Sequence, residues 1–187
     1  MRQLERTAMA PQADYLEFDD SLVDFAVAAY QEDGHWDAVG LPPHVAESLD
    51  AFLSALHQQV SEGPTIGLVG LGDEYFVAAR PVGARVLLFL SDVAAAVDDR
   101  IAGDVLDRVD PGADPRELAD GPIGDQDMFA DLGLDPLELA FVCERLQREP
   151  EFGLGEAVGG IASRLGFGEQ FAHAARRDEQ ADQWLDG

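Results

Sequence analysis

Short runs of apolar residues along the chain predict five β-strands. Residues 24–30 and 35–41 flank a turn that ends at Gly34, and a tight turn of this kind needs the positive φ that glycine tolerates. Three further runs, separated by short glycine-containing segments, predict an antiparallel meander: 65–71, 75–81 and 85–90. The last run is apolar without alternation, which favours a strand covered on both faces and central in the sheet.

Helical periodicity fills the segments around these strands. Apolar residues recur at spacings of three and four over 43–60 and of four over about 92–109, so each segment predicts a helix with one apolar face. Asp135, Pro136 and Glu138 have the pattern of a capping box and predict a helix that runs to about Arg148. Two shorter helices are predicted after it: about 155–165 and 169–177.

The order of the predicted elements is ββαβββα followed by a C-terminal helical segment. This order predicts the α+β class, with one five-stranded antiparallel sheet on which the helices pack. It is similar to the roadblock and longin type of domain, an analogy at the level of the fold alone. We divide the chain into a disordered acidic tail (1–22), an α+β sheet domain (23–109), an acidic linker (110–127) and a C-terminal helical segment (128–178).

Charge changes this picture more than composition does. Hydrophobic residues make up 47 % of the 187 residues, enough for a core, but 37 acidic side chains oppose 12 basic ones for a net charge of −25. Such a surface repels nucleic acid and anionic lipid, so we expect no direct nucleic-acid or membrane partner. All 12 basic residues are arginine, which favours a GC-rich genome over adaptation to high salt. No segment resembles a signal peptide or a membrane span, and we expect a cytoplasmic protein.

The sequence carries no catalytic signature. Its single cysteine, Cys143, excludes the Pro-Cys-x-x-Cys half of a zinc deaminase site and any multi-thiolate metal site. The place of Cys143 in a predicted helix favours a small buried hydrophobe over a nucleophile. The histidines are scattered, and no nucleophile motif or phosphate-binding glycine loop is present. We therefore expect no catalytic residue, cofactor or metal, although residues 125–135 could hold a divalent ion weakly through oxygen ligands.

Acidic and aromatic residues around the linker are the candidate partner-binding residues. Residues 110–135 hold eight acidic side chains and one arginine, and apolar residues up to Leu137 lie beside them. Mixed acidic and aromatic segments suit the docking of a basic partner. The alternative is that the apolar side chains simply close the core. The predicted partner-binding residues are Asp125, Asp127, Phe129, Asp131, Leu132, Phe167, Glu169 and Phe171.

Four stretches of the chain resemble a known family. They are 24–36, 89–97, 128–134 (Met-Phe-Ala-Asp-Leu-Gly-Leu) and 164–171 (Arg-Leu-Gly-Phe-Gly-Glu-Gln-Phe). Together they resemble the actinobacterial family called tRNA adenosine deaminase-associated protein, over about residues 23–172. The resemblance implies association with the deaminase that modifies the wobble adenosine, and it implies no catalytic residue. On this basis we expect a non-enzymatic accessory protein whose partner is a tRNA adenosine deaminase.

Two other interpretations stay open at this point. One is a homodimeric scaffold of the roadblock type that serves a different partner. The other is a small-ligand-binding protein or an enzyme of unknown substrate, which a deep pocket with convergent polar groups would favour.

Overall fold

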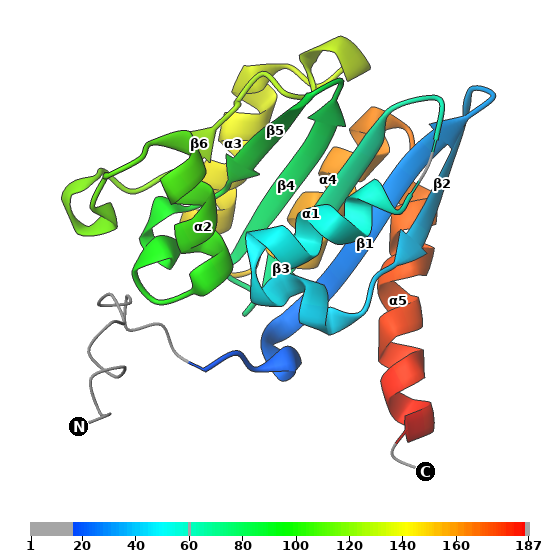
Figure 1. Ribbon diagram of the computed structural model, residues 1–187, viewed down its shortest axis with the longest axis horizontal. Helices are drawn as coiled ribbons and strands as arrows, with labels where there is room; N and C mark the ends of the chain where they lie inside the picture. The colour runs from blue at the N-terminus through cyan, green and yellow to red at the C-terminus, as the bar shows by residue number, and fades with distance from the viewer. Residues whose placement is uncertain (1–16, 60, 186–187) are drawn as a thin grey trace, which may run out of the picture.

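The structure is a computed structural model that describes residues 17–59 and 61–185, with side chains described through residue 176. One antiparallel sheet lies between two layers of helices (Figure 1). Its strand order is β2-β1-β3-β4-β5-β6. The strands are β1 (Val23–Glu32), β2 (His35–Gly40), β3 (Thr65–Leu71), β4 (Tyr75–Val82), β5 (Arg85–Leu90) and β6 (Ile123–Gly124).

Helices cover both faces of this sheet. Helices α1 and α2 lie on one face, and α3, α4 and α5 lie on the other (Figure 1). The α-helices are α1 (Leu49–His57), α2 (Arg100–Val109), α3 (Pro136–Arg148), α4 (Leu154–Leu165) and α5 (Gly168–Leu185). The short 3-10 helices are η2 (Asp20–Leu22), η3 (Pro43–Glu47), η4 (Val93–Val97), η5 (Pro115–Glu117) and η6 (Ala130–Leu132).

The α+β class is confirmed, but the prediction of five strands is wrong. The sixth strand, β6, comes from the segment predicted as a linker and pairs with Phe89 and Leu90 of β5. It has only two residues, next to Gly121 and Pro122, so no apolar periodicity marks it. The prediction that β5 is central is also wrong, because β5 is second from the edge and the fully buried β3 is central.

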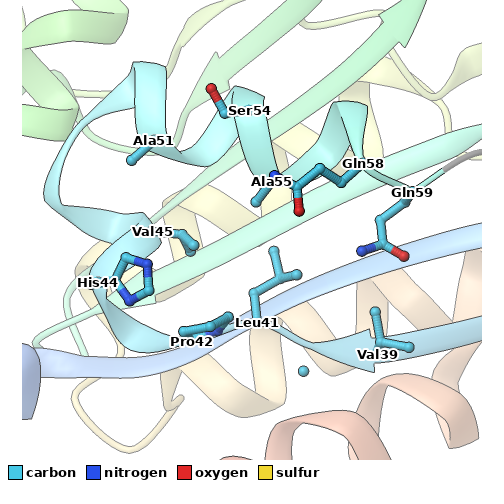
Figure 2. Close-up of a pocket in the computed structure, with 11 residues that line it drawn as sticks. Val39, Leu41, Pro42, His44, Val45, Ala51, Ser54, Ala55, Gln58 and Gln59 are labelled. Atoms are coloured by element: carbon cyan, nitrogen blue, oxygen red, sulfur yellow. The ribbon is translucent and has the colours of Figure 1, made fainter.

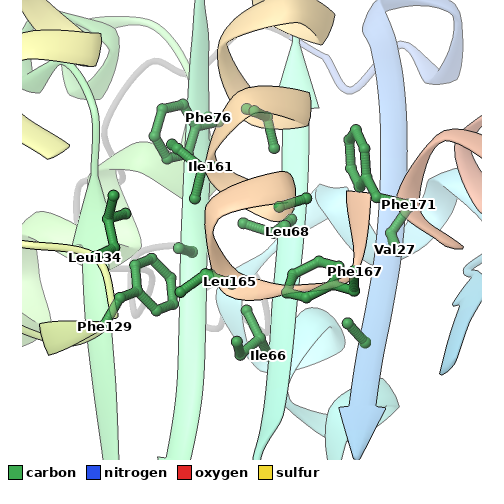
Figure 3. Close-up of a cluster of buried hydrophobic side chains, with 14 of the residues drawn as sticks. Val27, Ile66, Leu68, Phe76, Phe129, Leu134, Ile161, Leu165, Phe167 and Phe171 are labelled. Carbon is green, nitrogen blue, oxygen red and sulfur yellow. The ribbon is translucent and has the colours of Figure 1, made fainter. Parts of the chain in front are cut away.

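Two separate clusters of buried side chains hold the layers together. Alternate residues of each strand point to opposite faces, so Phe25 and Val27 of β1 join the cluster under α4 and α5, whereas Ala26 and Ala28 join the one under α1. Figure 3 shows the first cluster, where α4 lies across the strands. Because helices cover both faces, the strands have apolar runs rather than a clean alternation with polar residues.

The predicted helix 43–60 is wrong as a single helix. The structure has η3 and then α1, separated by Ser48, whose backbone is extended. The Ser48 hydroxyl accepts a hydrogen bond from the Ala51 N–H (3.1 Å) and so caps α1. The Asp104 carboxylate of α2 accepts a second one from the Leu49 N–H (3.1 Å). Both bonds satisfy amide groups at the start of α1 that a longer helix would have bonded internally.

The predicted helix 92–109 divides in the same way, into η4 and α2, at the extended residue Asp99. In contrast, α3 is confirmed with its predicted bounds and capping box. The Asp135 carboxylate accepts from the Leu137 N–H (2.7 Å), and the Glu138 carboxylate accepts from the Asp135 N–H (3.2 Å). This reciprocal pair of bonds fixes the first turn of α3.

Helix α5 packs along β1 and β2 and extends past residue 177, where the prediction ended it. Its Gln170 amide donates to the Trp36 carbonyl (3.3 Å), and the Asp37 carboxylate accepts from the Ala38 N–H (2.8 Å). These bonds occupy backbone groups on the outer edge of β2, so this edge is less open to another strand. Of the predicted tail 1–22, residues 1–16 lie outside the described part of the chain, and Asp20–Leu22 form η2.

Candidate partner-binding surface

Asp125 attaches the acidic segment to the sheet just after β6. Its backbone N–H donates to the Leu88 carbonyl (2.7 Å), and its carboxylate accepts from the Leu88 N–H (2.9 Å). The carboxylate of Asp125 is therefore bonded to the edge of β5. Its side chain holds the fold together as well as contributing negative charge.

Arg80 and Asp131 form a second attachment of the same segment. The Arg80 side chain is buried in β4 and donates to both Asp131 carboxylate oxygens (2.7 and 2.8 Å) and to the Met128 carbonyl (2.6 Å). Hydrogen bonding from the guanidinium, and its charge, hold the pKa of Asp131 below its usual value. The Asp131 side chain is 65 % exposed, so a carboxylate at the surface neutralises the charge of the buried Arg80 guanidinium.

The three aromatic rings of the predicted partner-binding residues lie in the core. Phe129, Phe167 and Phe171 are at most 3 % exposed (Figure 3). Phe171 stands edge-on to Phe25 of β1 (centroids 5.1 Å apart), and Phe167 lies 4.9 Å from Trp36 of β2. These rings thus close the core, which was the alternative interpretation, and they do not contribute to the surface.

The other predicted residues fall in two places. Asp127 and Asp131 are exposed beside the partly buried Leu132, in the segment attached to β4 and β5. Glu169 is exposed in the first turn of α5, which packs on β1 and β2. The segment 125–132 is therefore the one place where several predicted acidic residues gather.

Helix α3 follows this segment and exposes two large apolar side chains. Leu137 is 80 % exposed and Phe141 is 59 % exposed, whereas Leu139 and Cys143 on the opposite face are buried. Leu137 lies among the apolar residues predicted beside the acidic segment, whereas Phe141 is not among the predicted residues. The spacing of four residues between them was the available signal, because it places both on the helix face away from Leu139 and Cys143.

A groove of about 590 Å³ lies between the end of β2, η3 and α1 (Figure 2). Leu41 and Val45 form part of its apolar lining, and His44, Ser54 and Gln58 are polar groups in it. Among the described residues that line it there is no carboxylate and no cysteine. The groove thus lacks both a carboxylate pair for acid–base chemistry and a thiol nucleophile.

Burial raises the pKa of the Cys143 thiol to about 12, which disfavours the thiolate, the reactive form of cysteine. Among the side chains that the structure describes (residues 17–59 and 61–176), no three His, Cys, Asp or Glu side chains are grouped so that they could hold a metal ion. No described helix is both long enough and apolar enough to cross a bilayer.

Comparison with known proteins places these features in a family. The model of a family described as Rv3753c-like tRNA adenosine deaminase-associated protein matches residues 24–168. The chain is also similar to Protein Rv3753c from Mycobacterium tuberculosis (strain ATCC 25618 / H37Rv), with 35 % identity over 151 residues, which is 79 % of this chain and 85 % of the relative. No solved structure matches, and the likeness to the roadblock and longin type is not confirmed.

Proposed function

Because the chain belongs to the family of Rv3753c-like tRNA adenosine deaminase-associated proteins, we propose that it is a non-enzymatic accessory protein that binds a tRNA adenosine deaminase. The observation that carries this proposal is the family match, which spans the sheet and its helical layers as far as the start of α5. In this role the chain assists or regulates the deaminase through protein–protein contacts in the cytoplasm and does not itself hold tRNA.

The residues of the chain support an accessory role rather than the deamination reaction. A zinc deaminase needs a Pro-Cys-x-x-Cys pair of ligands together with a His or Cys ligand and a catalytic Glu. This sequence has one cysteine, and that cysteine is buried on the sheet side of α3. The groove beside α1 supplies neither a thiol nor a carboxylate.

The charge of the chain supports a basic partner. A deaminase that acts on tRNA must bind a polyanion, and such binding needs arginine and lysine side chains on its surface. A chain with a net charge of −25 is attracted to that kind of surface. Complementary charge speeds the encounter of two proteins and makes the complex sensitive to salt.

Titration of the purified deaminase from the same organism into this chain tests the proposal. We expect a complex at about 50 mM NaCl that weakens at about 500 mM, because salt screens the attraction between exposed charges. Absence of a complex at the lower salt concentration would contradict the proposal. A gel shift with tRNA and this chain alone serves as the control, and we expect no shift, because like charges repel.

A further inference from the structure

We propose that the exposed face of α3 around Leu137 and Phe141 is the surface on which the partner docks, and that the partner covers it with an apolar contact surrounded by arginine or lysine side chains. The inference rests on the proposed function, since it takes the deaminase as the occupant. It adds the place of docking and the chemistry of the surface that fits there.

Exposure singles out this face. Of the five large apolar side chains that are exposed in the described part of the chain, Leu137 and Phe141 are the two most exposed. They lie four residues apart on one helix face, whereas Leu22, Val82 and Val109 belong to separate elements. Phenylalanine is among the residues enriched in the apolar cores of interfaces, and a few residues of such a core supply most of the affinity.

The same face is rigidly supported. The capping box of Asp135 and Glu138 fixes the first turn of α3, and the opposite face of the helix is buried through Leu139 and Cys143. Arg164 of α4 donates to the Glu138 carboxylate (2.8 Å), which ties α3 to its neighbour. A surface held in this way loses little conformational entropy when a partner binds.

Charge decides which occupant fits. The segment that leads into α3 has four acidic residues from Asp125 to Asp135 and no basic one, and Asp127, Asp131 and Asp135 among them are exposed. Of these four only Asp131 is paired with an arginine, and within α3 two acidic residues balance two arginines, so the segment leaves an excess of negative charge at the start of the helix. A second copy of the chain would bring the same negative charge to the contact, whereas a basic surface would complement it.

The test compares double variants in the titration with the deaminase. Leu137→Ser with Phe141→Ser removes both apolar contacts, and we expect the affinity to fall by about 10- to 100-fold. The matched control is Val82→Ser with Val109→Ser, which removes two exposed apolar side chains elsewhere and should leave the affinity unchanged. Both pairs are on the surface, and circular dichroism melting curves establish that the variants fold.

Two single variants test the charge of the partner. Phe141→Arg and Phe141→Glu both remove the ring, but they place opposite charges in the contact. A basic surface predicts that Phe141→Arg binds more weakly than Phe141→Glu, and that the difference shrinks at about 500 mM NaCl. The reverse order would overturn the inference.

The outcomes separate this inference from the proposed function. If the unsubstituted chain binds the deaminase and the α3 double variant binds equally well, docking occurs elsewhere and only the inference fails. If the unsubstituted chain does not bind, both fail. Light scattering tests the other possible occupant, a second copy of the chain, by measuring the molar mass in solution. A homodimer that the α3 substitutions dissociate would show that this face is a self-association surface and would overturn the inference.

Discussion

At the scale of the residue, Arg80 explains how an acidic surface segment is held on an apolar sheet. Its guanidinium is buried in β4 and donates to the Asp131 carboxylate and the Met128 carbonyl. A buried arginine without a partner would be costly, so the segment must keep Asp131 in place. One acidic residue of the candidate surface therefore has a structural role that its neighbour Asp127 does not share.

Substitution Asp131→Asn should lower the free energy of unfolding by about 1 kcal/mol at pH 7, a modest cost because water screens a carboxylate that is 65 % exposed. The pKa of Asp131 is lowered in the folded state, so its charge stabilises the fold above the unfolded value of about 3.9. That contribution is lost as the pH falls through the lower, folded-state pKa. Urea unfolding at pH 7 and near pH 3 measures both effects.

Asp127→Asn is the matched control for this experiment, since Asp127 is exposed in the same segment. We expect no change in stability for it at either pH. An Asp131→Asn variant whose deficit stays constant with pH would show that the carboxylate charge is not what Arg80 requires.

At the scale of the element, the close contact of α1 with the sheet depends on a glycine. A Cβ atom added at Gly67 of β3 would lie 2.6 Å from Phe52 Cζ and 2.6 Å from Leu56 Cδ1 of α1. Both side chains are fully buried, so neither has space into which it can move. Glycine at this position therefore lets α1 approach the central strand more closely than any other residue would allow.

We expect Gly67→Ala to destabilise the chain by about 1–3 kcal/mol, the usual cost of overpacking a core. Gly160→Ala in α4 is the control, because a Cβ there meets nothing within 4 Å and its φ is not positive. Alanine is the better helix former, so the control should be neutral or more stable by up to about 1 kcal/mol. Thermal or urea unfolding compares the two, and equal stabilities would contradict the packing argument.

Elements defined by local sequence were predictable, and those defined by distant contacts were not. The meander strands and α3 follow from apolar runs, turns and a capping box that lie within each segment. The helix predicted over about 155–165 is confirmed in the same way as α4. In contrast, the break before α1 is stabilised by Asp104, 55 residues away, and β6 is held through Asp125, which bonds to Leu88 37 residues away, so both depend on contacts beyond the reach of periodicity.

The same limit applies to the candidate surface. The sequence identifies Phe129, Phe167 and Phe171 as apolar residues beside acids or glycines, but their burial depends on α4 and α5 lying across the sheet. Phe141 is not among the predicted residues because the prediction takes only the apolar residues up to Leu137, beside the acidic segment. The spacing of Leu137 and Phe141 places both on one face of α3, but contacts with distant parts of the chain determine which face the sheet covers.

At the scale of the whole molecule, the net charge of −25 acts on stability as well as on binding. The folded chain brings its negative charges closer together than the unfolded chain does, so their repulsion opposes folding. Salt weakens this repulsion, because the Debye length falls from about 30 Å at 10 mM to about 8 Å at 150 mM. The same screening weakens attraction to a basic partner, so salt should have opposite effects on stability and on the complex.

We therefore expect the melting temperature of the chain to rise by about 2–4 °C between 10 and about 150 mM NaCl, the shift that corresponds to about 1 kcal/mol for a domain of this size. Scanning calorimetry measures it, and repeating the scans near pH 4 supplies the control, because protonation of Asp and Glu should remove most of the effect. A melting temperature that falls with salt at pH 7 would mean that attractive ion pairs outweigh the repulsion. In that case the net charge of the chain would not be the cause of a salt-sensitive complex. The salt sensitivity would instead come from individual ion pairs between the deaminase and residues at the α3 face.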